Sequence, residues 1–163
     1  MTFLDDVARA LVAAGRSVRL DPDLSTIDVS SASVEKVLAV VRPTARAVTF
    51  YVVHPHAVPA DRLAAVSELV VRATADLLDA SLELDLATGS VAARFGVVLG
   101  EHEPGSEDLA ELLRAALETV ERAGSRYVTV IHDVVSGTLD ARTGAVAART
   151  APLQELSDEI DAR

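Results

Sequence analysis

Three of the chain's four histidines are the residues best placed to do chemistry. His54 and His56 form an H-x-H pair, which on a strand would face one side and could bind a metal ion. Pro55 between them disfavours regular strand geometry, and no third ligand is adjacent in the sequence. His102, between two glutamates, could complete such a site only if the two loops met, so solvated loop histidines are the simpler interpretation.

A second group, His132, Asp133 and Ser136, contains the residue types of a hydrolase. Neighbouring positions do not make a catalytic triad, because the three roles need convergent geometry and an exposed nucleophile. There is no G-x-S-x-G motif, and Lys36 follows no glycine-rich turn that could hold a phosphate. We therefore predict no catalytic residues and no cofactor, and we place this group on a helix surface.

A cluster of acidic residues around position 105 could be a cation site: Glu101, Glu103, Glu107, Asp108 and Glu111. The alternative is a solvated loop followed by a helix whose N-terminus favours negative charge. We adopt that second interpretation.

Composition excludes several classes of function. The chain has 163 residues, a formal net charge of −10, 50% hydrophobic residues, 3% aromatic residues and no cysteine. The absence of cysteine excludes disulfides and thiolate chemistry. The acidic charge disfavours nucleic acid and anionic membrane surfaces as partners. The apolar runs are too short to span a bilayer, and Thr2–Ala14 lacks the features of a signal peptide, so we expect a cytoplasmic protein.

The first third of the chain is predicted to contain one helix and several strands. Thr2–Ala14 carries a capping-box pattern and an apolar stripe, and it should end at Gly15. The alternating pattern then predicts strands near Val18–Leu20, at Lys36–Arg42 and at Ala45–Val53, with an extra strand at Ile27–Val29. Ser33 could instead cap a helix over Ser33–Val41.

Two helices and a hairpin follow. Pro59–Asp79 has a strong helical stripe. In Ala80–Gly100, Leu82, Leu84 and Leu86 are expected to face inward, and a turn at Gly89 leads to a second strand. A helix capped by Ser106 should end at Gly124. Tyr127–Ser136 fits either a strand or a helix.

The C-terminal part contains an internal similarity. Asp140–Arg149 resembles Asp85–Arg94 in sequence, which predicts a short hairpin, and a marginal terminal helix follows Thr150. We expect a single α+β domain over residues 1–137 and a C-terminal extension over residues 138–163.

The region from Phe50 to Gly137 resembles the YbjN family of bacterial proteins. The resemblance rests on the strand Thr49–Val53, Val58-Pro59 opening a long helix, the Leu-Glu-Leu-Asp…Thr-Gly…Val-Ala-Ala-Arg hairpin, the Ser-capped helix and Tyr127…Gly137. That family shares the fold of type III secretion chaperones. The resemblance implies an antiparallel sheet of about five strands packed with helices, in the order αβββαββα, and a helix at Tyr127–Ser136. The chaperones are dimeric binders of polypeptides, and YbjN-like proteins are associated with regulation.

We therefore expect a non-enzymatic protein-binding module, chaperone-like or a regulatory adaptor, that acts by burying apolar surface. A homodimer is the expected form, with a polypeptide client or regulatory partner. The alternative is a small metal- or ligand-binding enzyme that uses His54, His56 and His102.

Overall fold

A six-stranded antiparallel sheet forms the frame of the protein. The computed structural model describes residues 2–149. The strands follow one another in the order β1-β2-β3-β4-β6-β5. Their bounds are Val18–Asp21 (β1), Thr26–Val29 (β2), Val37–Arg42 (β3), Ala47–Val53 (β4), Ser81–Leu84 (β5) and Val91–Val98 (β6). The α+β class and the antiparallel pairing are as the sequence predicts, and both β1 and the extra strand β2 form.

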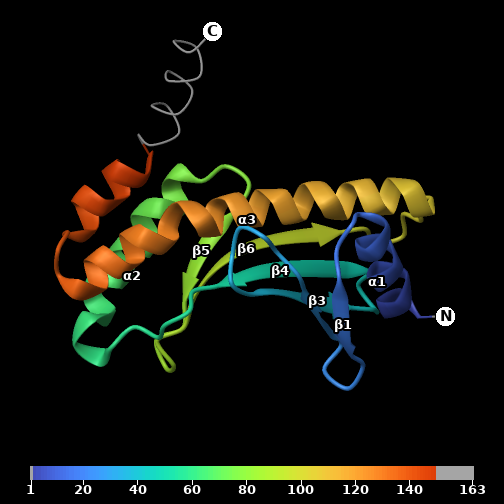
Figure 1. Ribbon diagram of the computed structural model, residues 1–163, viewed down its shortest axis with the longest axis horizontal. Coiled ribbons are helices and arrows are strands. Elements are labelled where there is room, and N and C mark those ends of the chain that lie inside the picture. Colours follow the sequence, from blue (N-terminus) through green and yellow to red (C-terminus); the bar gives the residue numbers. More distant parts are fainter. Residues whose placement is uncertain (1, 150–163) are drawn as a thin grey trace, which may run out of the picture.

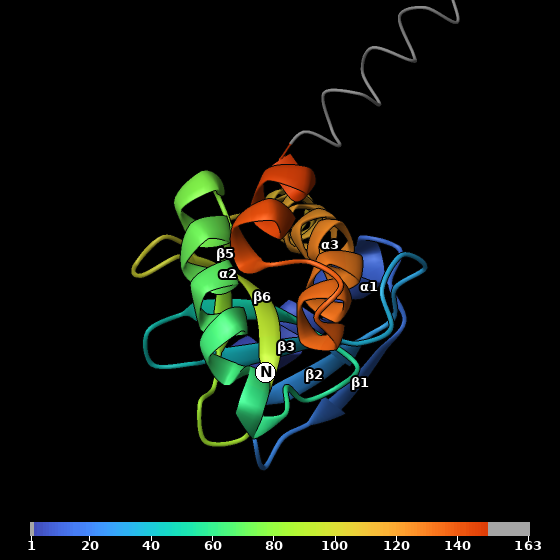
Figure 2. The same cartoon turned by 90° about the vertical axis from the view of Figure 1, so that its left-hand side faces the viewer.

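Helices pack on one face of this sheet and along one of its edges. They are α1 (Phe3–Ala13), the short 3-10 turn η1 (Ala60–Arg62), α2 (Leu63–Asp76) and α3 (Ser106–Ser136), followed by a helical segment at 141–149. Figures 1 and 2 show α1 and α3 on the same side of the sheet, with α2 at the β5 edge. The aliphatic core lies between these layers, around fully buried Phe50, Leu117 and Tyr127. None of the described helices combines the length and apolar character needed to cross a bilayer.

Helix α1 forms where its capping pattern predicts. The Thr2 hydroxyl accepts a hydrogen bond from the Asp5 backbone N–H at 3.3 Å, and the Asp5 carboxylate accepts one from the Thr2 N–H at 2.8 Å. Val7 and Leu11 are fully buried on its inner face. Gly15, with φ of +84°, follows the helix end.

The segment at Ser33–Val41 does not form the alternative helix. The Ser31 hydroxyl accepts hydrogen bonds from the N–H groups of Ser33 and Val34, which makes a local turn. From Val37 the chain pairs with β4 on one side and β2 on the other. The strand interpretation is confirmed, because two neighbouring ladders satisfy the backbone here.

Helix α3 is longer than the sequence predicts. It runs through Gly124 without a break, so the predicted end at Gly124 is wrong, whereas the helix at Tyr127–Ser136 is confirmed. The glycine is needed for packing: a Cβ atom there would lie 2.4 Å from Cγ1 of Val52 in β4. The helix ends instead at Gly137, which has φ of +83°.

The hairpin at Ala80–Gly100 forms, with Leu82 buried against Ala93 of β6. Leu86 was expected to face inward and is 64% exposed, because β5 ends at Leu84 and the turn begins there. Gly89 takes φ of +73° in this turn, as expected.

The prediction of a second hairpin at Asp140–Arg149 is wrong. Residues 141–149 are helical, with Ala141, Ala145 and Ala148 buried against the core and Gly144 close to Val130 of α3. A boundary at residue 137 stays a prediction. The helix predicted after Thr150 lies outside the described residues.

Candidate functional site

The second face of the sheet is the main candidate for a functional surface. Side chains along a strand alternate between two faces, and one set, including Phe50 and Val52, is buried beneath α1 and α3. We call the opposite set the open face, because in the described part of the chain no helix packs on its middle. Arg94 of β6 lies in the middle of this face, opposite Tyr51. The uncharged residues around it are Leu38, Val40, Ala47, Thr49, Tyr51, Val53, Ala92, Gly96 and Val98.

The strand register determines which side chains lie next to one another on the open face. Val40 of β3 lies opposite Thr49 of β4, which lies opposite Gly96 of β6. On this face β3 carries the large side chains of Leu38 and Val40, whereas β6 carries Ala92, Arg94 and Gly96, with Arg94 opposite Tyr51. A Cβ atom on Gly96 would have only the Thr49 hydroxyl within 4 Å, at 3.8 Å, so there is open space above Gly96.

Two hollows occur on the open face. The larger, of about 710 Å³, is floored by Leu38, Val40, Tyr51 and Val53, with Val70 of α2 at its margin. The smaller, of about 530 Å³, lies over β1 to β3 and shares Leu38. Both are within the size range of ligand sites, but they are floored by neighbouring strands, which suits an extended partner.

Two ion pairs lie on the open face. Arg19 pairs with Asp28 across β1 and β2, and Arg94 pairs with Glu83 across β5 and β6. The hydrogen bonds to Asp28 and Glu83 raise the pKa of Arg19 and of Arg94 respectively above the usual value. These charges, including that of the central Arg94, are therefore paired within one chain.

The charges on the open-face strand positions balance. The basic residues there are Arg19, Arg42 and Arg94, and the acidic residues are Asp21, Asp28 and Glu83. The whole chain, by contrast, has a formal net charge of −10. The negative potential of the protein thus arises elsewhere on its surface.

The histidines of the alternative site do not come together. His54 follows the end of β4, whereas His102 lies beyond the end of β6. The two strands are antiparallel, with Val53 opposite Ala92 and Val98 opposite Ala47, so these two ends lie at opposite ends of the strand pair. The two ends are about 20 Å apart, at about 3.4 Å per residue. In the described residues no group of three or more His, Cys, Asp or Glu side chains is arranged to hold a metal ion.

The H-x-H pair itself forms a local turn. The Nδ1 atom of His54 lies 2.9 Å from the His56 carbonyl oxygen and can donate to it. Their rings meet edge to face, with centroids 6.2 Å apart. His54 also borders an apolar pocket of about 140 Å³ beneath α3. This pocket lies at the opposite end of the β4–β6 pair from His102.

The remaining candidate residues, the hydrolase-like group and the acidic cluster, lie at the two ends of α3. His132 is exposed near the end of α3, and the Ser136 hydroxyl donates to the Asp133 carbonyl at 3.0 Å, which closes the last turn. All five members of the acidic cluster are exposed, and they lie in the loop before α3 and on its first turns. Within that cluster Glu103 lies 3.6 Å from Arg46.

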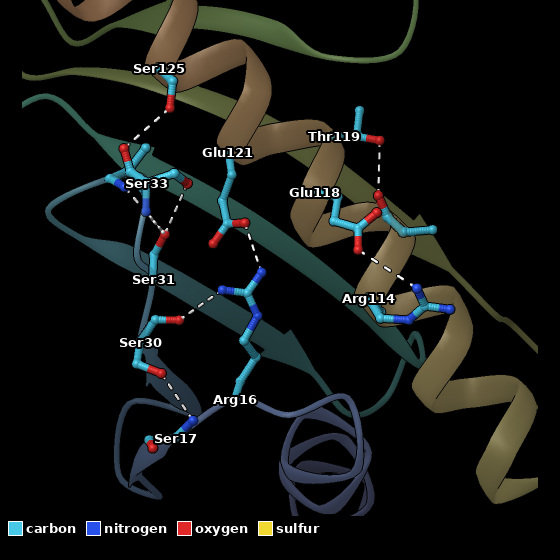
Figure 3. Close-up of polar contacts among 12 residues, drawn as sticks. Arg16, Ser17, Ser30, Ser31, Ser33, Arg114, Glu118, Thr119, Glu121 and Ser125 are labelled. Atoms are coloured by element: carbon cyan, nitrogen blue, oxygen red, sulfur yellow. Dashed lines mark hydrogen bonds and ion pairs between the residues drawn. The ribbon is translucent and has the colours of Figure 1, made fainter.

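Sequence reasoning missed a buried ion pair between Arg16 and Glu121 (Figure 3). Arg16 donates to Glu121 Oε2 at 2.8 Å and to the Ser30 carbonyl at 3.2 Å. The Glu121 side chain is only 8% exposed, and its Oε1 atom is buried without a hydrogen-bond partner among the described atoms. The signal in the sequence was an acid within the apolar stripe of α3, next to Val120. This pair ties the β1–β2 end of the sheet to α3.

Comparison with known proteins supports the fold. No family model and no curated protein matches the chain. Among solved structures, the chain is similar to a crystal structure of YbjN from E. coli, a protein proposed to be a transcription regulator. The TM-score is 0.61 at 12% sequence identity, and the match covers 76% of this chain and 89% of that one. The chain therefore has the YbjN-like α+β fold that its sequence pattern resembles.

Proposed function

We propose that this protein is a non-enzymatic, cytoplasmic protein-binding module, chaperone-like or a regulatory adaptor, whose working surface is the open face. The observation that carries the proposal is a largely apolar sheet face on which no described helix packs and whose central arginine, Arg94, is paired with Glu83. Half-buried Leu38, Val40 and Val53 are not part of the core that the helices share. Burying such surface against another polypeptide is favourable by about 25 cal/mol per Å².

The form of this surface suits a polypeptide better than a small molecule. Small-molecule sites are concave and place a few polar groups at converging positions. The open face instead presents apolar side chains of β3, β4 and β6 in a broad sheet, and two of its arginines, Arg19 and Arg94, are paired with Asp28 and Glu83. The YbjN neighbour, proposed to be a transcription regulator, is compatible with a binding role.

Site-specific photocrosslinking in growing cells tests this function. Benzoylphenylalanine is placed at Val40 on the open face, or at Val71, which is 71% exposed on α2, as a matched control. The proposal predicts protein adducts of defined mass from position 40 and none of the same mass from position 71. Thermal unfolding of both variants confirms that the fold is retained. Folded protein without position-specific adducts would contradict the proposal.

A further inference from the structure

We infer that the apolar pocket beneath α3 is a binding site for a small, uncharged aromatic molecule with one hydrogen-bond donor, of about the size of phenol. The pocket has a volume of about 140 Å³ and lies between the second half of α3, the end of β4 and the start of β6. Helix α3 passes over both strands on the helix side of the sheet (Figure 1). The site is therefore separate from the open face, and the inference does not depend on the proposed function.

Small residues under α3 leave this space. Ala93 of β6 lies between Val52 of β4 and Leu82 of β5 in the sheet register. Gly124 of α3 lies so close to Val52 that no side chain fits between them, which fixes the distance from helix to sheet. Protein interiors contain few voids larger than a water molecule, because an empty apolar void loses the contacts of its lining atoms. The buried residues that line this pocket are Val52, Leu82, Val91, Ala93, Tyr127 and Ile131.

The volume and the charges around the pocket favour an uncharged aromatic ring. An apolar cavity of about 150 Å³ is large enough to bind benzene, and this pocket has nearly that volume. Exposed Ser33, Glu35, Pro55 and Val128 lie at its mouth, so a small molecule can enter from solvent. Glu35 and the formal net charge of −10 both disfavour a ring that carries a carboxylate.

His54 supplies a hydrogen-bonding group at the pocket. Its backbone N–H donates to the Val91 carbonyl at 2.9 Å, which continues the register of β4, so the side chain lies on the helix side as Val52 does. Nδ1 of His54 lies 2.9 Å from the His56 carbonyl oxygen and 3.3 Å from the His56 nitrogen. The shorter contact favours the ring proton on Nδ1, which makes Nε2 an acceptor. Among the described residues none donates to Nε2, so a ligand hydroxyl can do so.

A free molecule suits this pocket better than a side chain of the proposed polypeptide partner. That partner is expected on the open face, whereas Val52 and Ala93 of the pocket point to the other side of the sheet. A tyrosine side chain has the same phenol ring, so the experiment must compare the free ring with a ring attached to a peptide backbone.

Titration with phenol, followed in ¹⁵N–¹H correlation NMR spectra, tests the site. We expect saturable shifts with a dissociation constant between about 0.1 and 1 mM, as for a ligand of few atoms. The largest shifts should be at pocket amides such as Gly124 and Ala93. Benzoate should bind at least about fivefold more weakly, because of its charge. N-acetyltyrosinamide should also bind more weakly than phenol, and tighter binding would overturn the free molecule as occupant.

Two equally exposed positions of α3 provide a variant and its matched control. Val128 at the mouth and Leu112 are each 39% exposed, and Leu112 does not line the pocket. They lie about 24 Å apart along the helix, at about 1.5 Å per residue. Val128→Phe should block the mouth and weaken phenol binding at least about tenfold, whereas Leu112→Phe should bind phenol like the wild type. Both sites are on the surface, and thermal unfolding checks that both variants keep the fold.

Toluene, which has the size of phenol but no donor, tests the role of His54. His54→Phe should weaken phenol binding about fivefold relative to toluene binding, because only phenol loses a hydrogen bond. The ratio of the two dissociation constants is insensitive to a general loss of stability. An unchanged ratio overturns the role of His54. Absence of saturable shifts up to about 10 mM phenol, or phenol binding that Val128→Phe leaves unchanged, overturns the site, and neither result affects the crosslinking expected from position 40.

Discussion

Gly124→Ala should destabilise the protein, although replacing a glycine inside a helix by alanine usually stabilises it. Gly124 lies inside α3, where replacing glycine by alanine normally stabilises a helix by about 0.5–1 kcal/mol. Here the added Cβ would lie 2.4 Å from Cγ1 and 2.8 Å from Cβ of Val52. Carbon atoms in contact are normally about 3.5–4.0 Å apart, so helix and strand must separate by more than about 1 Å.

The expected loss follows from two opposing effects. Overpacking a well-packed core costs about 1–3 kcal/mol, and the upper end applies because α3 is one continuous helix of 31 residues that cannot shift at a single residue. Subtracting the helix-propensity gain leaves a net loss of about 2 kcal/mol. For a chain of this length that lowers the melting temperature by about 4–8 °C.

A double-mutant cycle with Val52→Ala, measured by urea denaturation, tests this reasoning. Val52→Ala removes the nearest atom, so Gly124→Ala should cost at least about 1 kcal/mol less in that background. Ala115→Gly, at an exposed site of α3, measures helix propensity alone and should cost about 1 kcal/mol. A rise in stability for Gly124→Ala, or the same effect in both backgrounds, would refute the close-approach argument.

Three further predictions concern stability. Arg16→Met leaves buried Glu121 unpaired and should lower the free energy of unfolding by about 3–5 kcal/mol, measured by denaturant unfolding. Adding Glu121→Met to the same chain should restore most of that stability. No recovery in the double variant would contradict the pairing. Gly89→Ala should lower the melting temperature more than Gly15→Ala, because both have positive φ but only at Gly89 would the Cβ meet a backbone oxygen, at 2.4 Å. Hydrogen bonds from backbone N–H groups and a threonine hydroxyl of its turn lower the pKa of Asp85 below 3.8. The folded state thus binds fewer protons near pH 4, and stability should fall as the pH drops through the folded pKa, less so in Asp85→Asn.

Local signals in the sequence were sufficient for elements whose stabilising contacts are close in the chain. The capping box of α1 joins Thr2 to Asp5, and the turn of the β5–β6 hairpin depends on Gly89. Such patterns fix short-range hydrogen bonds wherever they occur. The six-stranded sheet was therefore largely predictable, including the strands around Val18 and Ile27.

Features that depend on distant contacts were not predictable. Gly124 has the residue type of a helix end, and only its position over Val52 explains why the helix continues. The make-up of the open face depends on which residues of β3, β4 and β6 lie opposite one another, and register is a property of the folded sheet. The apolar residues of the open face were visible as strand residues, but the side that each would face was not.

The two similar sequence segments show the limit of local information most directly. Asp85 and Asp140 each begin a D-x-x-T-G pattern, and each accepts a hydrogen bond of 2.8 Å from the threonine hydroxyl three residues later. A backbone N–H also bonds each carboxylate, and these bonds lower the pKa of both aspartates. The local chemistry is the same in the two segments.

The elements that follow are nevertheless different. After the first copy, Val91 pairs with Leu84, because strand β5 precedes the turn and offers a ladder. The second copy comes directly after the end of α3 and has no such strand before it. Its alanines instead pack against the core as one face of a helix, and Gly144 allows close contact with Val130. The pattern therefore specifies an aspartate-capped turn, and the neighbouring surface decides whether a strand or a helix continues from it.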